Sequence, residues 1–406
     1  MKILIVNKFL FPNGGSETYI FEIGKQLQKM GHEVQYFGME HEGRIVGNHA
    51  ESYTSDMDFH GGGLQKLLYP FKIIYSVEAR KKVRIVLDDF KPDVVHLNNF
   101  NFQITPSIIY EVRKWEKKMG NKIPIIFTAH DYQWVCPNHM MMIPSTGELC
   151  FQCEGAKFGQ CTRNKCIHNS GVKSLIGTLE AKLYHFLRTY RQVNRIICPS
   201  RFMEGKLASN PLLAGKLETI YNFLNGEKYK AAEKKDYVLY FGRFSEEKGV
   251  RTLLKVCNDL KEIPFVFAGG GPLVGELAGY SNITNRGFLK GDELKKTISE
   301  AKFTVFPSEW YENCPFSMME TQWYGTPVIA SAIGGVPELV QDGVTGELFE
   351  AGNAAELKEK IMKLWNEKEL CEKYAKNCEN VSFDSVEEYC NRLLKIYEEE
   401  AKGYKG

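Results

Sequence analysis

Short runs of apolar residues alternate with longer amphipathic stretches along the first part of the chain, a pattern typical of alternating strands and helices. Residues 3–6 predict a buried strand, residues 17–30 a helix that ends at Gly31, and residues 34–37 a second strand. Two strands joined through a helix pair in parallel with a right-handed crossover. The pattern therefore predicts an α/β domain built on a parallel sheet.

The alternation starts again after a polar linker at residues 226–236, where the run Y-V-L-Y-F predicts the first strand of a second α/β domain. A chain of 406 residues also exceeds what a single hydrophobic core usually supports. We place the first domain at residues 1–216 and the second at residues 217–387, followed by a closing helix at 388–406.

A helix is predicted from Pro315 to the residue before Gly325, because proline suits a first helical turn and a glycine followed by a proline is a stop signal. The free N–H groups and the positive dipole end at its start attract a phosphate. Glu320 lies roughly 7–8 Å along this helix, so Glu312 and Glu320 can bracket a bound molecule at two depths. Two acidic residues at this spacing are common by chance, so the interpretation depends on its context.

The loop after the opening strand of the second domain carries Arg243 and Lys248 between two glycines. Each charge alone is compatible with an ordinary solvated residue. Together, at the head of a helix, they predict an anion site that suits a diphosphate. The loop after the first strand of the chain lacks G-x-G-x-x-G, which disfavours a nicotinamide-type dinucleotide site.

Polar residues follow two strands of the first domain. His96 and Asn98 lie at the end of the strand predicted at residues 94–97, and His130 and Asp131 follow the next one. The carboxyl ends of strands in an open α/β sheet border the ligand crevice, which makes all four candidates. For His96 alone a satisfied, uninvolved side chain is the favoured interpretation, and Asp131 either orients the imidazole or caps a turn.

Five of the eleven cysteines fall between Cys136 and Cys166. Four of them follow the spacing C-x2-C-x7-C-x4-C, at Cys150, Cys153, Cys161 and Cys166. In a reducing compartment a structural zinc explains such a cluster better than disulfides do. The alternative is a set of unrelated loop cysteines.

Residues 173–195 show a long amphipathic pattern with five positive charges against one carboxylate, Glu180. The apolar side consists of Leu175, Leu179, Leu183, Phe186 and Leu187, and the charges are Lys173, Lys182, Arg188, Arg191 and Arg195. A basic amphipathic helix can lie on an anionic bilayer. The favoured interpretation is that its apolar face packs on the sheet, and both can hold at once.

With 43% hydrophobic and 25% charged residues the composition is that of a soluble globular protein, and a net charge of +2 argues against a dedicated nucleic-acid binder. Residues 1–200 hold 25 Lys+Arg against 18 Asp+Glu, a net +7, and residues 201–406 hold 27 against 32, a net −5. The first half is therefore the better candidate to meet an anionic surface, although scattered charges would give the same balance. We expect no spanning helix and no signal peptide, and reduced thiols in the cytoplasm.

Three motifs together resemble those of retaining, nucleotide-sugar-dependent glycosyltransferases of family 4. The first is G-G-x-E at residues 14–17, the second is G-R-x-x-x-x-K-G at residues 242–249, and the third is the stretch 306–331 with two Glu separated by seven residues. The resemblance implies the GT-B fold, an α/β architecture of two Rossmann-like domains facing each other across a cleft. It also implies that the helix at 388–406 crosses back to complete the first domain.

The resemblance assigns roles by position. Glu312 lies against the donor sugar, Glu320 binds the ribose hydroxyls, and Arg243 and Lys248 bind the diphosphate. The other implied positions are Gly15 beside the donor phosphates, Phe288 near the base, the helix start at Phe316 and Ser317, and His130 close to the transferred sugar. One departure is Cys314-Pro315, where many relatives have Phe-Gly, and Pro315 removes an N–H that could otherwise meet the donor.

The implied reaction moves a sugar from a nucleotide-diphosphate donor to a sugar or lipid-linked sugar with retention, in bacterial-type surface polysaccharide or glycolipid synthesis. It needs no divalent metal, since two cations and a helix dipole face the leaving group. Alternatives are an epimerase or phosphorylase of the same fold and a zinc-stabilised binding protein. A metal-dependent enzyme using the D-x-D at residues 56–58 is a further alternative, which we attribute to chance.

Overall fold

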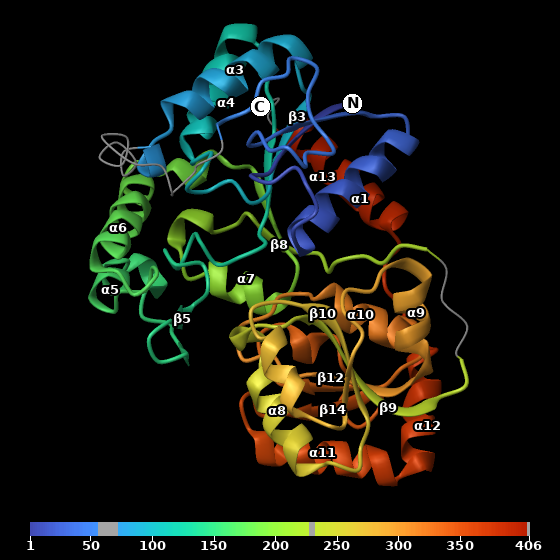
Figure 1. Ribbon diagram of the computed structural model, residues 1–406. Coiled ribbons are helices and arrows are strands. Elements are labelled where there is room, and N and C mark those ends of the chain that lie inside the picture. The colour runs from blue at the N-terminus through green and yellow to red at the C-terminus, as the bar shows by residue number, and fades with distance from the viewer. Residues whose placement is uncertain (56–71, 227–231, 404–406) are drawn as a thin grey trace. The chain divides into compact units, whose positions relative to one another are not determined.

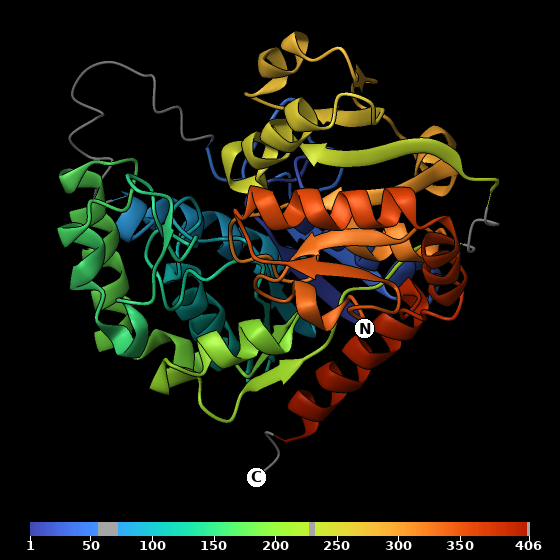
Figure 2. The same ribbon diagram turned by 90° about the horizontal axis from the view of Figure 1, so that it is seen from below.

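The computed structural model describes residues 1–55, 72–226 and 232–403 (Figures 1 and 2). The chain forms two compact units, one of Met1–Tyr221 with Val386–Gly406 and one of Asn222–Ser385. The D-x-D at residues 56–58 lies outside the described residues. None of the helices in the described parts of the chain combines the length and apolarity needed to cross a bilayer.

Unit 1 is built on a parallel sheet of six strands in the order β2-β1-β3-β4-β7-β8. Its strands are short and, apart from the edge strand β8, mostly apolar, because helices cover a parallel sheet on both faces. The strands are β1 Lys2–Val6, β2 Glu33–Phe37, β3 Val94–Leu97, β4 Ile125–Thr128, β7 Arg195–Cys198 and β8 Leu217–Thr219. The helices are α1 Gly15–Lys29, α3 Val77–Phe90, α4 Ser107–Met119, α5 Gly159–Arg163, α6 Gly171–Phe186, α7 Arg201–Leu207 and α13 Val386–Lys402.

The last helix, α13, belongs to unit 1 and packs against α1. The hydroxyls of Tyr19 and Tyr389 lie 2.9 Å apart, and the Tyr397 hydroxyl lies 2.6 Å from His96 Nδ1. All four side chains are buried. The last helix of the chain therefore completes the core of unit 1, to which the first helix also belongs.

Unit 2 has a second parallel sheet in the order β11-β10-β9-β12-β13-β14. The strands are β9 Lys235–Arg243, β10 Phe265–Gly270, β11 Ile283–Asn285, β12 Ala301–Phe306, β13 Val328–Ser331 and β14 Gly346–Phe349. The helices are α8 Val250–Asp259, α9 Gly291–Glu300, α10 Phe316–Trp323, α11 Ala354–Asn366 and α12 Lys368–Cys378. Two Rossmann-like sheets confirm the predicted α/β fold class.

The helix predicted to start at Pro315 is α10, and Pro315 is its N-cap residue. Proline is extended there (φ −69°, ψ 126°), so the missing N–H falls just before the first turn. The helix ends where Gly325 takes a φ of +68°, a conformation that glycine adopts without strain.

The single helix expected over residues 173–195 is wrong in extent and in orientation. The helix α6 ends at Phe186, Arg188 takes a left-handed φ of +52°, and residues 189–192 form a separate 3-10 turn before β7. The apolar side expected to pack on the sheet is exposed, with Leu179 at 47% and Phe186 at 82%. Small side chains on the opposite side pack inward instead, which lets the helix approach its neighbours closely.

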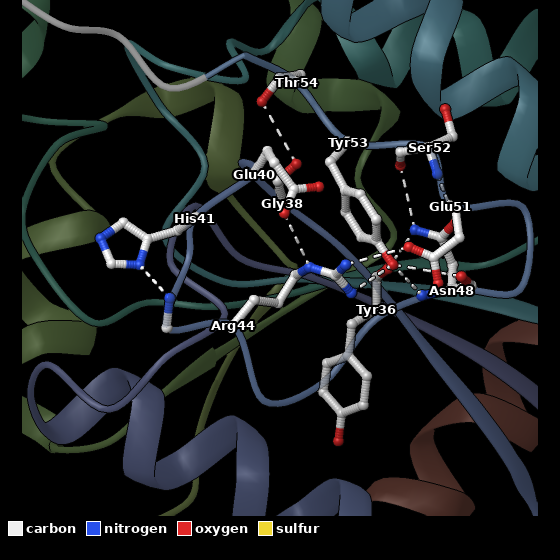
Figure 3. Close-up of polar contacts among 11 residues, drawn as sticks. Tyr36, Gly38, Glu40, His41, Arg44, Asn48, Glu51, Ser52, Tyr53 and Thr54 are labelled. Atoms are coloured by element: carbon white, nitrogen blue, oxygen red, sulfur yellow. Dashed lines mark hydrogen bonds and ion pairs between the residues drawn. The ribbon is translucent and has the colours of Figure 1, made fainter.

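The long connection after β2 is ordered around one guanidinium (Figure 3). Arg44 donates to Glu40, to the Tyr53 hydroxyl at 2.8 Å and to Glu51 at 3.1 Å. The Asn48 amide donates to the carbonyl of Tyr36, the penultimate residue of β2, at 2.9 Å. These contacts fix the described part of the loop, residues 38–55, to the carboxyl end of its strand.

Candidate active site

Two neighbouring strands of unit 2 end in charged loops that meet. The chain leaves β9 through Arg243 and Lys248, and it leaves β12 through Ser308 and Glu312. Lys248 Nζ lies 2.5 Å from Glu312 Oε1. The structure therefore brings two of the predicted site residues into direct contact at the carboxyl ends of the strands, where ligands bind in open α/β sheets.

The Glu312 carboxylate is buried and held from three sides. Its Oε1 accepts hydrogen bonds from Lys248 Nζ, from Ser308 Oγ at 2.7 Å and from Trp310 Nε1 at 2.7 Å. Only 6% of the residue is exposed. The main-chain carbonyl of Glu312 accepts the N–H of Gly335 at 2.7 Å, so side chain and backbone are both fixed.

The guanidinium of Arg243 differs from the Lys248 ammonium in its exposure and in its ion pairing. Arg243 is the last residue of β9 and is exposed. Within the described residues it makes no ion pair with a carboxylate. A cation at a strand end that has no carboxylate to neutralise it can receive an anion from solution.

Glycines let the loops approach one another. Gly249 has a φ of +67°, and a Cβ there would lie 1.8 Å from the Pro307 carbonyl oxygen. A Cβ on Gly269 would lie 1.9 Å from the Gly242 carbonyl oxygen. The glycines after β9 and in β10 therefore allow close backbone packing, which sets the position of Lys248 beside β12.

The start of α10 follows the same loop. The first-turn N–H groups of a helix have no intrahelical acceptor. In α10 this turn contains Phe316 and Ser317, which are both half-exposed. The loop before them is tied down because the Asn222 amide donates to the Cys314 carbonyl at 2.8 Å and its backbone N–H points at the Cys314 sulfur at 3.3 Å.

Glu320 and Phe288 lie on the same unit. Burial raises the pKa of the Glu320 carboxyl to about 7, and Lys295 opposes this rise. Phe288 follows β11 and is 75% exposed, with Lys290 Nζ 5.3 Å from its ring centroid. An exposed aromatic ring at a strand end is a surface on which a base can stack.

In unit 1 polar side chains gather at the ends of the adjacent strands β3 and β4. His130 Nε2 lies 2.9 Å from Asn98 Oδ1, and Asn98 Nδ2 donates to the His96 carbonyl at 3.4 Å. Because the Asn98 oxygen is the acceptor, the imidazole of His130 carries a proton on Nε2. Burial lowers the pKa of His130 to about 4, so the ring is neutral near pH 7.

The other strand-end candidates have structural partners. His96 is fully buried between Tyr397 and Thr128, the latter 2.8 Å from Nε2, which agrees with the favoured interpretation of a satisfied histidine. Asp131 accepts the Gln133 N–H at 3.0 Å and lies 2.9 Å from His139 Nδ1. Of the two roles considered for Asp131, these contacts favour the turn cap.

The glycine loop at the start of α1 is built around a buried carboxylate. Glu17 is 2% exposed and accepts from Asn7 at 3.0 Å and from Ser16 at 2.9 Å. Gly15 is the first residue of α1 and is exposed. The buried Glu17 side chain thus anchors the loop, while Gly15 stays exposed to solvent.

Sequence reasoning missed Ser308, Trp310 and Asn222, which position Glu312 and Cys314. The first two lie within four residues of Glu312, so proximity in the loop was an available clue. Asn222 lies 92 residues before Cys314 and offered none.

The cysteine loop of unit 1 is compact. Cys136, Cys153, Cys161 and Cys166 are buried, the last three packed in one cluster, while Cys150 is half-exposed. Cys136, Cys150, Cys153 and Cys166 line a small enclosed cavity. In the described parts of the chain no three His, Cys, Asp or Glu side chains are arranged as a metal site.

Comparison with known proteins gives the family. The model of Glycosyltransferase Family 4 matches residues 13–228, and that of glycosyl transferases group 1 matches residues 224–381. An uncharacterized glycosyltransferase of Methanocaldococcus jannaschii is 30% identical over 240 residues, covering 57% of this chain and 67% of that protein. The amylovoran biosynthesis glycosyltransferase AmsK of Erwinia amylovora is 25% identical over 263 residues, covering 60% and 64%.

Solved structures agree on the fold. The Anabaena protein HepE, in complex with UDP-glucose, aligns with a TM-score of 0.65 at 16% identity, covering 98% of this chain and 100% of that one. With both family models and the two Rossmann-like sheets in agreement, the chain belongs to glycosyltransferase family 4 and is a glycosyltransferase of the GT-B fold.

Proposed function

We propose that this glycosyltransferase moves a sugar from a nucleotide-diphosphate donor to an acceptor hydroxyl, with retention of the anomeric configuration and without a catalytic divalent metal. The observation that carries the proposal is the Lys248–Glu312 pair, with Arg243 at the end of the adjoining strand β9. A cation that can meet phosphate and a fixed carboxylate that can meet a sugar hydroxyl lie 2.5 Å apart.

Most of the proposed donor contacts belong to unit 2, and the role of Gly15 of unit 1 beside the donor phosphates stays a prediction. Arg243, Lys248 and the first turn of α10 bind the diphosphate, Phe288 stacks on the base, and Glu320 accepts from the ribose hydroxyls. The Anabaena neighbour binds UDP-glucose, which supports a donor of this class.

In the proposed step the bond between the anomeric carbon and the phosphate oxygen breaks while the acceptor oxygen bonds to the same face of that carbon. The acceptor proton passes to the departing phosphate oxygen, so no protein nucleophile is needed. Negative charge grows on the diphosphate, and Arg243, Lys248 and the α10 dipole stabilise it more in the transition state than in the bound donor. His130, which is predicted to lie close to the transferred sugar, is neutral and donates its Nε2–H to Asn98.

The acceptor is proposed to be a sugar or a lipid-linked sugar in polysaccharide or glycolipid synthesis. The relative in amylovoran biosynthesis supports this class. All eleven cysteines lie in the described residues and none forms a disulfide there, which supports the proposal that the enzyme works in the reducing cytoplasm.

A labelled-donor experiment tests transfer directly. With donor alone the enzyme should leave the sugar unchanged, and with a suitable acceptor label should appear in the acceptor at full rate in the presence of EDTA. Label that changes configuration on the intact donor would identify an epimerase, and loss of transfer on chelation would contradict the metal-free mechanism.

Donor affinity should depend on pH through Glu320. Only the ionised carboxylate accepts from two ribose hydroxyls, and with a pKa of about 7 it is protonated as the pH falls below that value. We expect the donor Kd, measured by calorimetry, to be about tenfold higher at pH 6 than at pH 8. Glu320→Gln should weaken binding at pH 8 and flatten the profile; an unchanged profile in that variant would exclude Glu320 as the titrating group.

A structural zinc remains our proposal for the cysteine loop, and the enclosed thiol-lined cavity supports it. Cys150, Cys153, Cys161 and Cys166 would hold the ion. Three of these four line the cavity together with Cys136, and Cys161 packs in one cluster with Cys153 and Cys166. We expect about one zinc per chain by elemental analysis, and chelation should lower the Tm before it lowers transfer. Cys198→Ser, in a buried strand elsewhere in unit 1, should keep the metal; native protein without zinc would refute the proposal.

A further inference from the structure

The helix α6 of unit 1 has its apolar residues on the outside. The exposed fractions are 70% for Val172, 46% for Leu175, 47% for Leu179, 82% for Phe186 and 46% for Leu187. At about 100° per residue these five side chains fall on one side of the helix. Figures 1 and 2 show α6 (green) at the margin of unit 1. We call this side of α6, with these five residues, the apolar stripe.

The opposite side of α6 is locked in place by small and polar residues. The Ser174 hydroxyl accepts the Ile167 N–H at 2.9 Å, and the hydroxyls of Thr162 and Thr178 bond at 2.8 Å. A Cβ on Gly177 would lie 2.4 Å from Ile167 Cδ1, so this side leaves no room for a larger residue. The helix therefore cannot rotate to bury its leucines, and the exposure of the stripe is built into the packing.

The exposed charged residues of α6 and of the turn that follows it are all positive. Lys173, Lys182, Arg188 and Arg191 are exposed, and at about 100° per residue the two lysines flank the stripe on either side. Glu180 is the only carboxylate between residues 171 and 191, and its side chain is buried on the inner side. The outer surface of α6 thus presents apolar side chains bordered by cations.

We propose that the apolar stripe docks on the surface of an anionic lipid bilayer, with α6 lying in the plane of the interface. Large apolar residues flanked by lysine and arginine are what binds a helix to such a surface. With sixteen residues, α6 spans about 24 Å and lies on the membrane without crossing it. A second copy of the chain is the poorer occupant, since a twofold contact between two stripes would set like charges against each other.

Membrane docking goes beyond sugar transfer and does not depend on it. Its test uses neither donor nor acceptor, so failure here and failure of the proposed function are distinguishable. If both hold, unit 1 works at the surface where a lipid-linked acceptor resides.

The test is co-sedimentation of the full chain with vesicles. We expect binding to vesicles with about 30% phosphatidylglycerol, binding at least about tenfold weaker to pure phosphatidylcholine, and further loss at high salt. The double variant Leu175→Ser, Phe186→Ser should bind at least about tenfold more weakly than the parent, because two apolar side chains lose their insertion energy. Met119→Ser, an exposed apolar residue on α4 of the same unit at 40%, is the matched control and should bind like the parent.

A second measurement follows a signal that appears on binding, so that the test does not depend only on a variant that has lost binding. The emission of Phe186→Trp should shift to the blue on adding the anionic vesicles, and that of Met119→Trp should not. Equal binding by the double variant and the parent would overturn the proposal. A second result would also overturn it: the parent protein stays in the supernatant with vesicles, and light scattering shows that the parent forms a dimer that the double variant does not form.

Discussion

Arg243→Ala should lower kcat/KM for sugar transfer by at least about 100-fold, because removing one preformed charged contact to a developing oxyanion typically costs that much. The guanidinium is exposed and, in the described residues, pairs with no carboxylate, so the free energy of unfolding should stay within about 0.5 kcal/mol of the parent. A fall in rate without a fall in stability would assign the side chain to the donor.

Arg251→Ala is the matched control for this experiment. Arg251 follows eight residues later, and it is tied to Glu276 at 2.9 Å and to Glu246 at 3.1 Å on the surface. Its loss should leave kcat/KM unchanged, since exposed ion pairs contribute little. Parental turnover in Arg243→Ala, or an equal loss in both variants, would show that the diphosphate is bound elsewhere.

Lys248→Ala should reduce both activity and stability. The ammonium is proposed to bind phosphate, so kcat/KM should fall by about 100-fold or more. The same change leaves the buried Glu312 carboxylate without its cation, which should cost about 3 kcal/mol of unfolding free energy in a urea titration. The two losses have separate causes and can be separated by a second substitution.

The double variant Lys248→Met, Glu312→Gln should recover most of that stability and none of the activity. A neutral pair of similar volume removes the stranded charge, because Ser308 and Trp310 can still donate to the amide oxygen of the new side chain. The phosphate and sugar contacts remain lost. Activity that returns together with stability would mean that the Lys248–Glu312 pair only holds the loop and does not touch the donor.

The fold was largely predictable because its pattern is local. The strand expected at residues 94–97 is β3, and the helix expected from Pro315 to the residue before Gly325 differs from α10 by one residue at each end. Parallel strands buried on both faces give continuous apolar runs, and proline and glycine mark the ends of α10. Each of these features depends only on residues that follow one another in the sequence.

The contacts within the site depend on distant parts of the chain. Lys248 and Glu312 are 64 residues apart, and only the placement of β12 beside β9 brings them together. His96 and His130 stand in similar strand-end contexts, yet His96 is satisfied by Tyr397, 301 residues away on the returning helix α13. Sheet order and the return of α13 cannot be read from local periodicity.

The orientation of α6 shows how a periodic pattern can mislead. The leucine periodicity predicted an inward apolar face, but the serine, glycine, threonine and alanine residues pack inward because their small size permits close contact with the cysteine loop. Periodicity identifies two faces of a helix, and complementarity to its neighbours decides which one is buried.

The donor site itself is tested most directly by a crystal structure with a bound nucleotide sugar, chosen from UDP-, GDP- and ADP-sugars by thermal shift. We expect diphosphate density within hydrogen-bond distance of Arg243 and Lys248 at the start of α10, with the sugar against Glu312. A well-occupied nucleotide sugar bound elsewhere, with the Lys248–Glu312 contact undisturbed and no density beside Arg243, would contradict the proposed donor site.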